Sequence, residues 1–176
     1  MKTPTELTAA IRERARAQHE HYAGGEERPL AGYLATMATY ASLVGALALG
    51  ARATGRDVPE LSTSDVIRCA AATQKLSRLL AKDPVTSPLR APFTSYEGTA
   101  GPAELQEGVR GHGGRKTVGE LVTCPFCTGV WVATGFTAGL VYLPRTTRLA
   151  IATLTALAGA DLLQYGHALL EKAAEG

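Results

Sequence analysis

Three long runs of uncharged, mostly apolar residues separate the polar parts of this sequence. The first run covers residues 29–51 and the second covers residues 121–144, and neither contains an acidic or basic side chain. The third covers residues 149–170 and is interrupted only by Asp161 and His167. At about 1.5 Å of rise per residue, a helix through each run is long enough to cross a hydrocarbon layer of about 30 Å. The pattern therefore predicts membrane spans at about 30–51, 121–143 and 148–170.

A soluble interpretation competes with this one, because helices rich in Ala, Gly and Thr also fill the cores of soluble proteins. Three uncharged runs of spanning length are hard to bury in a soluble core of this size, so the pattern favours a membrane protein. Only residues 144–147 join the second run to the third. A connection this short predicts that the two helices form an antiparallel hairpin.

A helix of different character is predicted at residues 65–82, between the first and second runs. It follows a cap at Ser62, Thr63 or Ser64, and its apolar side lies opposite a cationic stripe made by Arg68, Lys75, Arg78 and Lys82. Three interpretations stay open. The stripe is a solvated face, or it lies in the membrane interface on anionic headgroups, or it belongs to a short span whose cations meet a carboxylate such as Asp161.

Two polar segments complete the domain organisation. Residues 1–28 predict a soluble helix, because Thr3, Pro4 and Glu6 supply an N-cap, a first-turn proline and a capping-box acid. Residues 83–117 are rich in Gly and Pro and predict a long loop. The expected fold class is all-α: a small helical membrane bundle at 29–176 with three to four spanning or half-buried helices, preceded by the polar helix at 1–28.

Composition and charge narrow the classes of function. The 176 residues suit one compact unit, and 45% of them are hydrophobic while 19% are charged. A formal net charge of +2, with no basic run that interleaves aromatic residues, gives no reason to expect a nucleic-acid partner. Three cysteines in a chain of this length do not predict a disulfide framework.

The segment with the most distinctive chemistry is the sequence CPFC, in which Cys124 and Cys127 flank Pro125. Either a helix passes through and kinks at Pro125, or it begins there with Cys124 as its cap. The two thiols, with Glu120 nearby, are packing residues, a redox pair or metal ligands. Zinc needs about four ligands, so Cys69, His112 or Asp83 would have to complete the set.

Asp161 is the second candidate, because it lies inside an apolar run. An ionisable group within a span costs at least ~2.5 kcal/mol unless it is paired or reaches water. Lys75, Arg78 and Gln164 are the expected partners. No second acid lies three or four residues away, so a carboxylate-bridged metal site is not predicted.

Two further segments carry a resemblance to a known family. One comprises ATQKLSRL at 72–79 followed by D-VT-PLRAPF from Asp83 to Phe93, and the other comprises GEL at 119–121 followed by CPFCTGVW at 124–131. Together they resemble bacterial domain of unknown function family 1360, over about residues 66–164. The resemblance implies a small multi-pass membrane protein of a family in which some members are named as sporulation-associated. It assigns no activity, but its segments add Asp83 and Arg90 to the candidate site residues.

The expected function is that of a non-enzymatic structural or interaction component of the cell membrane. Its expected partners are the lipid bilayer and either further copies of the chain or another membrane protein. The alternative is a thiol-redox or zinc-binding membrane protein that uses Cys124 and Cys127. If the helix at 65–82 also crosses, four spans place the N-terminal helix and the loop at 83–117 on one side of the membrane, which we expect to be cytoplasmic. The basic residues of these two segments are Arg12, Arg14, Arg16, Arg110, Arg115 and Lys116.

Overall fold

The computed structural model describes residues 3–174, which form seven α-helices, one short 3-10 helix and one two-stranded sheet. The α-helices are α1 (Pro4–Ala23), α2 (Leu30–Ala53), α3 (Thr63–Lys82), α4 (Ser87–Arg90), α5 (Gly114–Thr123), α6 (Pro125–Tyr142) and α7 (Pro144–Ala174). The remaining elements are η1 (Pro84–Thr86), β1 (Thr94–Gly101) and β2 (Glu104–Val109).

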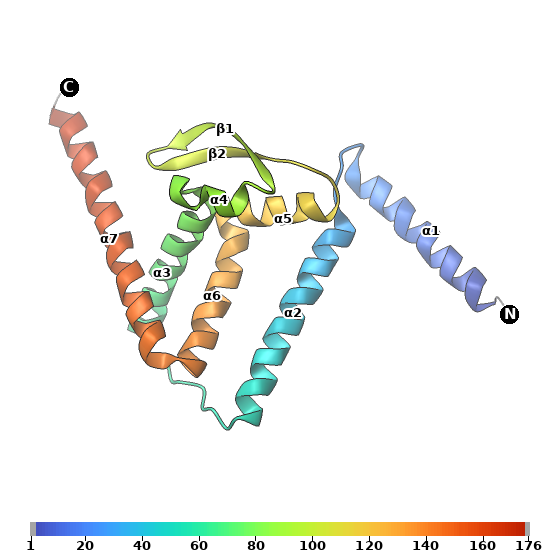
Figure 1. Ribbon diagram of the computed structural model, residues 1–176, viewed down its shortest axis with the longest axis horizontal. Helices are drawn as coiled ribbons and strands as arrows, with labels where there is room; N and C mark the ends of the chain where they lie inside the picture. The colour runs from blue at the N-terminus through green and yellow to red at the C-terminus, as the bar shows by residue number, and fades with distance from the viewer. Residues whose placement is uncertain (1–2, 175–176) are drawn as a thin grey trace.

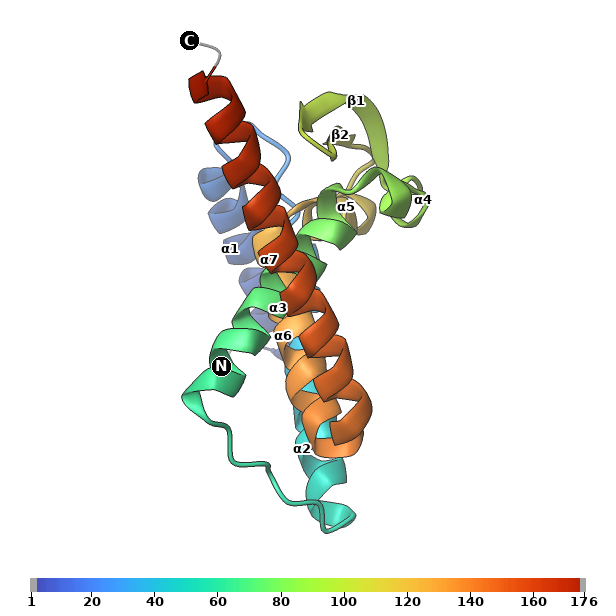
Figure 2. The same ribbon diagram turned by 90° about the vertical axis from the view of Figure 1, so that its left-hand side faces the viewer.

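The centre of the molecule is α3, which packs against both α6 and α7. Figure 1 shows α2 running beside this group, with the β1–β2 hairpin, α4 and α5 gathered at one end of the long helices. The link between α2 and α3 and the turn between α6 and α7 lie at the other end. Figure 2 shows that α7 rises past the hairpin, while α1 projects away from the bundle in Figure 1.

The buried core is small and lies where α3, α6 and α7 meet. Ala72, Phe136, Leu140 and Ile151 are buried there and pack against the partly buried Cys69, Leu76, Val132 and Leu154. Most other large apolar side chains face outward. None of the residues of α2 is buried, and the side chains of Leu34, Met37 and Leu49 are about two-thirds exposed. Surfaces of this kind are stable when lipid, rather than water, surrounds them.

Two helices, α2 and α7, are long and apolar enough to cross a membrane, and α5 with α6 would make a third if the bent pair counts as one span. The expected span at 30–51 corresponds to α2. The expected span at 148–170 lies within the longer α7, because Pro144 suits the first helical turn and the expected link at 144–147 is helical. Only Leu143 separates α6 from α7.

The expected span at 121–143 is divided between two helices, because the chain bends by 80° between α5 and α6. Cys124 precedes Pro125 and has the extended backbone that a residue before proline prefers, with φ −101° and ψ 107°. Pro125 then opens α6, and the Cys124 Sγ accepts a hydrogen bond from the Cys127 N–H at 3.3 Å. The second alternative for this motif is therefore the observed one. The carbonyl of Leu121, left free by the break, accepts a bond from the Thr128 hydroxyl at 3.0 Å.

The expected all-α fold and the expected loop at 83–117 are corrected by the β1–β2 hairpin. Its antiparallel register pairs Thr94 with Val109 and Gly101 with Glu104, and two irregularities interrupt it. Gly-Pro-Ala at 101–103 makes the turn, with Ala103 at a φ of +58°. The same segment also contains η1, α4 and the start of α5, so it is a folded cap on the bundle.

Arg90 anchors this cap. Its side chain is 1% exposed and forms an ion pair with Glu107 of β2, which is 6% exposed. The guanidinium also donates to the Leu80 carbonyl and the Thr86 hydroxyl, each at 2.7 Å, and to the Asp83 carbonyl at 3.1 Å. Leu80 and Asp83 stand at the end of α3, where helix carbonyls lack partners within the helix. One buried cation thus ties β2 and α4 to the end of α3.

Replacing one member of this buried pair is expected to destabilise the cap strongly. Glu107→Gln leaves the Arg90 charge buried without its carboxylate, and the free energy of unfolding should fall by about 3–5 kcal/mol. Chemical unfolding in detergent, followed by circular dichroism, measures the change. The control is Arg110→Ala, which removes an exposed arginine whose guanidinium donates to the Ala91 carbonyl at 2.6 Å. Its expected cost is below about 1 kcal/mol, and equal losses in both variants would contradict the anchoring role.

A second tie connects the segment before α2 to the start of α5. The Glu27 carboxylate accepts from His112 Nδ1 at 2.5 Å and from the Gly113 N–H at 3.1 Å. These two bonds, first that from His112, hold the pKa of Glu27 below its ordinary value of 4.5. Because the charged carboxylate makes the contact, the tie is fully present above that value and is lost as the pH falls through the lowered pKa.

Hydrogen exchange should therefore detect a local change at acidic pH. The protection factor of the Gly113 amide, corrected for the intrinsic exchange rate, should hold from pH 7 down to about pH 4.5 and then decline. The Thr117 amide is the internal control, since it donates to the Gly113 carbonyl at 3.0 Å within α5 and needs no carboxylate. Glu27→Ala, which removes the accepting oxygen, should show the low Gly113 protection already at pH 7. Unchanged protection in that variant would refute the tie.

Candidate functional site

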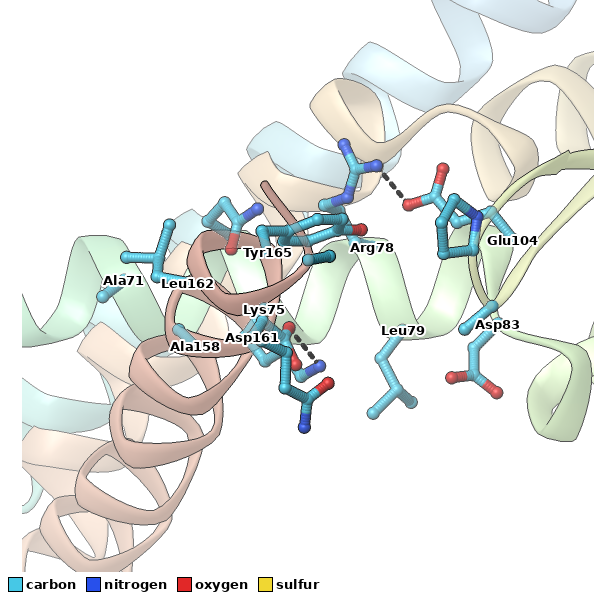
Figure 3. A pocket seen from close by; sticks show the side chains of 15 residues that line it. Ala71, Lys75, Arg78, Leu79, Asp83, Glu104, Ala158, Asp161, Leu162 and Tyr165 are labelled. Atoms are coloured by element: carbon cyan, nitrogen blue, oxygen red, sulfur yellow. Dashed lines mark hydrogen bonds and ion pairs between the residues drawn. The ribbon is translucent and has the colours of Figure 1, made fainter. Parts of the chain in front are cut away.

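The principal cavity is a cleft of about 640 Å³ between α3, α7 and the turn of the β1–β2 hairpin. Its walls combine apolar surface with a group of charged and polar side chains. The lining residues are Ala71, Gln74, Lys75, Arg78, Leu79, Asp83, Pro102, Ala103, Glu104, Ala158, Asp161, Leu162, Gln164, Tyr165 and Ala168. Figure 3 shows Asp83 and Glu104 on the hairpin side of the cleft, with Lys75 and Asp161 further along the helices.

Helical periodicity places these residues on facing surfaces. Ala71, Lys75 and Arg78 recur at intervals of three or four residues and so share one face of α3. Ala158, Asp161 and Tyr165 do the same on α7. The cleft thus combines single faces of two helices with a third wall from the hairpin.

The Lys75–Asp161 ion pair crosses the cleft. The Lys75 Nζ donates to Asp161 Oδ2 at 2.5 Å, and the two side chains are 22% and 40% exposed. Lys75 is one of the partners expected for Asp161, and it lies on α3, the helix that carries the cationic stripe. The contact with a carboxylate that the third interpretation of the cationic stripe expected is thus present, and α3 packs against both α6 and α7.

A second ion pair joins α3 to the hairpin. Arg78 binds Glu104, and their side chains are 47% and 21% exposed. Asp83, by contrast, has no cationic partner among residues 3–174; its Oδ1 accepts from the Val85 N–H at 2.8 Å and so begins η1. The cleft therefore contains two cations and three carboxylates.

Other polar groups in the cleft also lack partners. Gln74, Gln164 and Tyr165 are exposed, Tyr165 by 51%, and within residues 3–174 their side chains make no hydrogen bond to another protein group. Small-molecule sites are usually concave, with apolar walls and a few polar groups that fix the orientation of the ligand. The arrangement suits a ligand that has both charged and apolar parts.

The structure brings together four of the residues proposed from the sequence, namely Lys75, Arg78, Asp83 and Asp161. Arg90 lies outside the cleft, where its buried ion pair supports the hairpin wall. Glu120 is also elsewhere: it accepts a hydrogen bond from the Tyr33 hydroxyl at 2.6 Å and joins α5 to α2. These two residues therefore have structural contacts.

The cysteines do not form a metal centre with the residues named for it. Cys69 packs against the core, while His112 contacts Glu27 and Asp83 lines the cleft. Among residues 3–174, no three His, Cys, Asp or Glu side chains are grouped so that they could hold a metal ion. Cys124 and Cys127 are free thiols at the break between α5 and α6, with Cys124 as the α6 cap. The geometry gives no support to zinc at this pair.

The sequence analysis did not single out Glu104, although it lines the cleft. The signal for Glu104 was the Gly-Pro-Ala turn between two short segments that contain Thr, Tyr and Val, which is typical of a β-hairpin. Nothing in the pattern pairs that turn with α3, however. The contact between Arg78 and Glu104 arises from the tertiary packing of the cap.

Comparisons with known proteins cover most of this site. Residues 69–167 match the family described as "Protein of unknown function (DUF1360)". The chain is 32% identical over 97 residues to a protein from Bacillus subtilis (strain 168) named "Sporulation protein YjcA", an alignment that covers 53% of this chain and 81% of the relative. No solved structure matches. The matched region runs from α3 into α7 and includes every cleft residue except Ala168.

A double-mutant cycle tests the ion pair that crosses the cleft. Asp161→Asn and Lys75→Gln should each lower stability, whereas the double variant should lose less than the sum because no unpaired charge remains. The expected coupling is about 1–2 kcal/mol, measured by chemical unfolding in detergent. Coupling near zero would show that the pair does not hold α3 to α7.

Proposed function

The chain belongs to the family "Protein of unknown function (DUF1360)", as its sequence resemblance predicted, and from this premise we propose a multi-pass protein of the cell membrane that acts by binding rather than catalysis. In this proposal α2, α3, α6 and α7 cross the bilayer. The cleft between α3 and α7 is the binding site. The observation that carries the proposal is the presence of paired charges and unpartnered polar groups in a cavity between two helices of the bundle.

The distribution of arginine and lysine supports four crossings and an orientation. The end of the bundle with the α2–α3 link and the α6–α7 turn carries Arg52, Arg56, Arg68, Arg145 and Arg148. The opposite end, with α1, the hairpin and the end of α7, carries Arg12, Arg14, Arg16, Arg28, Lys82, Arg90, Arg110, Arg115, Lys116 and Lys172. Since cytoplasmic loops are richer in basic residues, we place the hairpin end in the cytoplasm.

The exposed apolar surface of α2 supports lipid as the main partner. A helix of 24 residues whose apolar window is 0% buried within the chain needs an apolar environment along its length. Association with further copies or with another membrane protein stays a prediction.

Binding is favoured over catalysis because of the types of residue in the cleft. The lining residues include no histidine, serine or cysteine, and the one lysine among them is held in an ion pair with Asp161. Both cations already face carboxylates, an arrangement that suits recognition of charge. The thiol-redox alternative rests only on Cys124 and Cys127, which lie outside the cleft.

Cysteine labelling tests the topology. In a variant whose native cysteines are replaced by alanine, a single Asp57→Cys at the α2–α3 link should react with a membrane-impermeant maleimide in intact cells. A single Thr99→Cys in the hairpin should react only after the cells are permeabilised. Reaction of both positions under the same condition, or recovery of the protein in the supernatant after high-speed centrifugation, would overturn the membrane arrangement.

Narrowing the cleft tests the binding site. Ala168→Trp places a large side chain at the rim, and Ala160→Trp makes the same change at an exposed position of α7 outside the cleft. Native mass spectrometry of the detergent-purified chain should show a bound small molecule in the wild type and in Ala160→Trp. Its occupancy should fall at least tenfold in Ala168→Trp. Equal occupancy in both variants, or none in the wild type, would contradict the proposal.

A further inference from the structure

We propose that the cleft binds the headgroup of a phospholipid that carries both a phosphate and a primary ammonium, as an ethanolamine phospholipid does. This inference rests on the proposed function, because it assigns a ligand class to that same cleft. Three features carry it: the depth of the cleft in the bilayer, the order of its charges and the apolar wall beside them.

The depth follows from the lengths of the helices. Counted from Arg148 at the far end of α7, Asp161 lies about 20 Å along the helix and Tyr165 about 26 Å, at about 1.5 Å per residue. A hydrocarbon layer of about 30 Å therefore ends near the hairpin side of the cleft. Tyr165 is half-exposed there, at the level where aromatic side chains meet headgroups. The hairpin end of the cleft therefore lies at the depth of lipid phosphates, while the Lys75–Asp161 pair lies about 10 Å deeper.

The charges are arranged in order along that depth. Lys75 and Arg78 lie on one face of α3 within a single turn, and each pairs with a carboxylate of the cleft, Lys75 with Asp161 and Arg78 with Glu104. Arg78 lies nearer the hairpin, so it is the cation that an entering phosphate reaches first. Asp83 lies closer to water at the end of α3 and has no cationic partner among residues 3–174. A primary ammonium can donate to this carboxylate. Along the cleft, the cations of Lys75 and Arg78 come first and the carboxylate of Asp83 follows. This order matches a phosphate followed by an ammonium.

Charge balance favours a zwitterion over a simple anion. Three carboxylates and two cations line the cleft, so an anionic headgroup with no ammonium would add to an existing excess of negative charge. A cation alone would lie beside Lys75 and Arg78. A headgroup with both charges satisfies both ends of the cleft, and the unpartnered amides of Gln74 and Gln164 supply further donors and acceptors.

The acyl chains have an apolar path out of the cleft. Ala71, Ala158 and Leu162 contribute apolar wall, and Leu162 is 73% exposed. In the proposed membrane arrangement this exposed surface faces lipid. The ligand can therefore enter from the bilayer without passing through water, which distinguishes a lipid from a water-soluble phosphoethanolamine compound.

The experiment uses the full chain, purified in a maltoside detergent and titrated with defined lipids by native mass spectrometry. Ethanolamine, choline and glycerol phospholipids with identical acyl chains compare the headgroups, and glycerophosphoethanolamine tests the soluble source. We expect the ethanolamine lipid to bind at least tenfold more tightly than the glycerol lipid, and more tightly than the choline lipid, whose quaternary ammonium has no N–H to donate. Glycerophosphoethanolamine should bind at least tenfold more weakly than the lipid.

Variants connect the selectivity to the cleft. Asp83→Asn keeps an oxygen for the Val85 N–H but removes the charge, and should abolish the preference for ethanolamine over choline. The double variant Lys75→Gln with Arg78→Gln should weaken all three phospholipids at least tenfold, while Lys82→Gln removes a cation of α3 outside the cleft and should change nothing. Arg78→Lys keeps the charge and serves as a milder variant if the double variant loses its helical circular dichroism.

The results distinguish a failure of the proposed ligand from a failure of the proposed binding function. The glycerol or choline lipid could bind as tightly as the ethanolamine lipid or more tightly, and Ala168→Trp could still abolish that binding. This result overturns the ethanolamine assignment and leaves the binding function in place. Binding of glycerophosphoethanolamine as tight as that of the lipid overturns the bilayer as the source. If no compound shows binding that Ala168→Trp abolishes, both the ethanolamine assignment and the binding function are overturned.

Discussion

The burial of one arginine constrains the whole cap of this protein. A guanidinium that is 1% exposed needs a counter-charge and acceptors for its N–H groups, and Arg90 obtains them from Glu107 and from groups at and after the end of α3. These contacts join β2 to the long helices. The hairpin turn, with Glu104 beside Arg78, is thereby held over the cleft. The hairpin wall of the cleft thus depends on an ion pair that lies outside the cleft.

The remaining architecture follows from how little apolar surface the chain buries within itself. The core at α3, α6 and α7 is small, and α2 leaves its apolar length exposed. In the membrane arrangement that we propose, lipid supplies the environment that a larger core would supply in water. Charged side chains are costly in such an environment unless they are paired, and the Lys75–Asp161 pair joins α3 to α7 across the cleft.

Several features were predictable because they depend on neighbouring residues. The capping boxes of Thr3 with Glu6 and of Ser62 with Asp65 begin α1 and α3, and Pro125 ends one helix and starts the next. The need of Asp161 for a partner also followed from its position in an apolar run. The hairpin and Glu104 were not predicted, because Gly- and Pro-rich sequence suits a loop as well as a turn between strands. Zinc at Cys124 and Cys127 gained no support, because the other proposed ligands lie elsewhere.

By itself, the sequence determined the long apolar helices, the cap of α1, an irregularity at Pro125 and membership of the family, since each rests on local pattern or on matched segments. Whether the helix kinks at Pro125 or begins there was decided by the structure. Only the tertiary structure decided which charges meet. Lys75 and Asp161 are 86 residues apart, and Arg78 and Glu104 are 26 apart. Such contacts depend on how helices cross and where the cap docks, and periodicity along one helix carries no information about the distance to another.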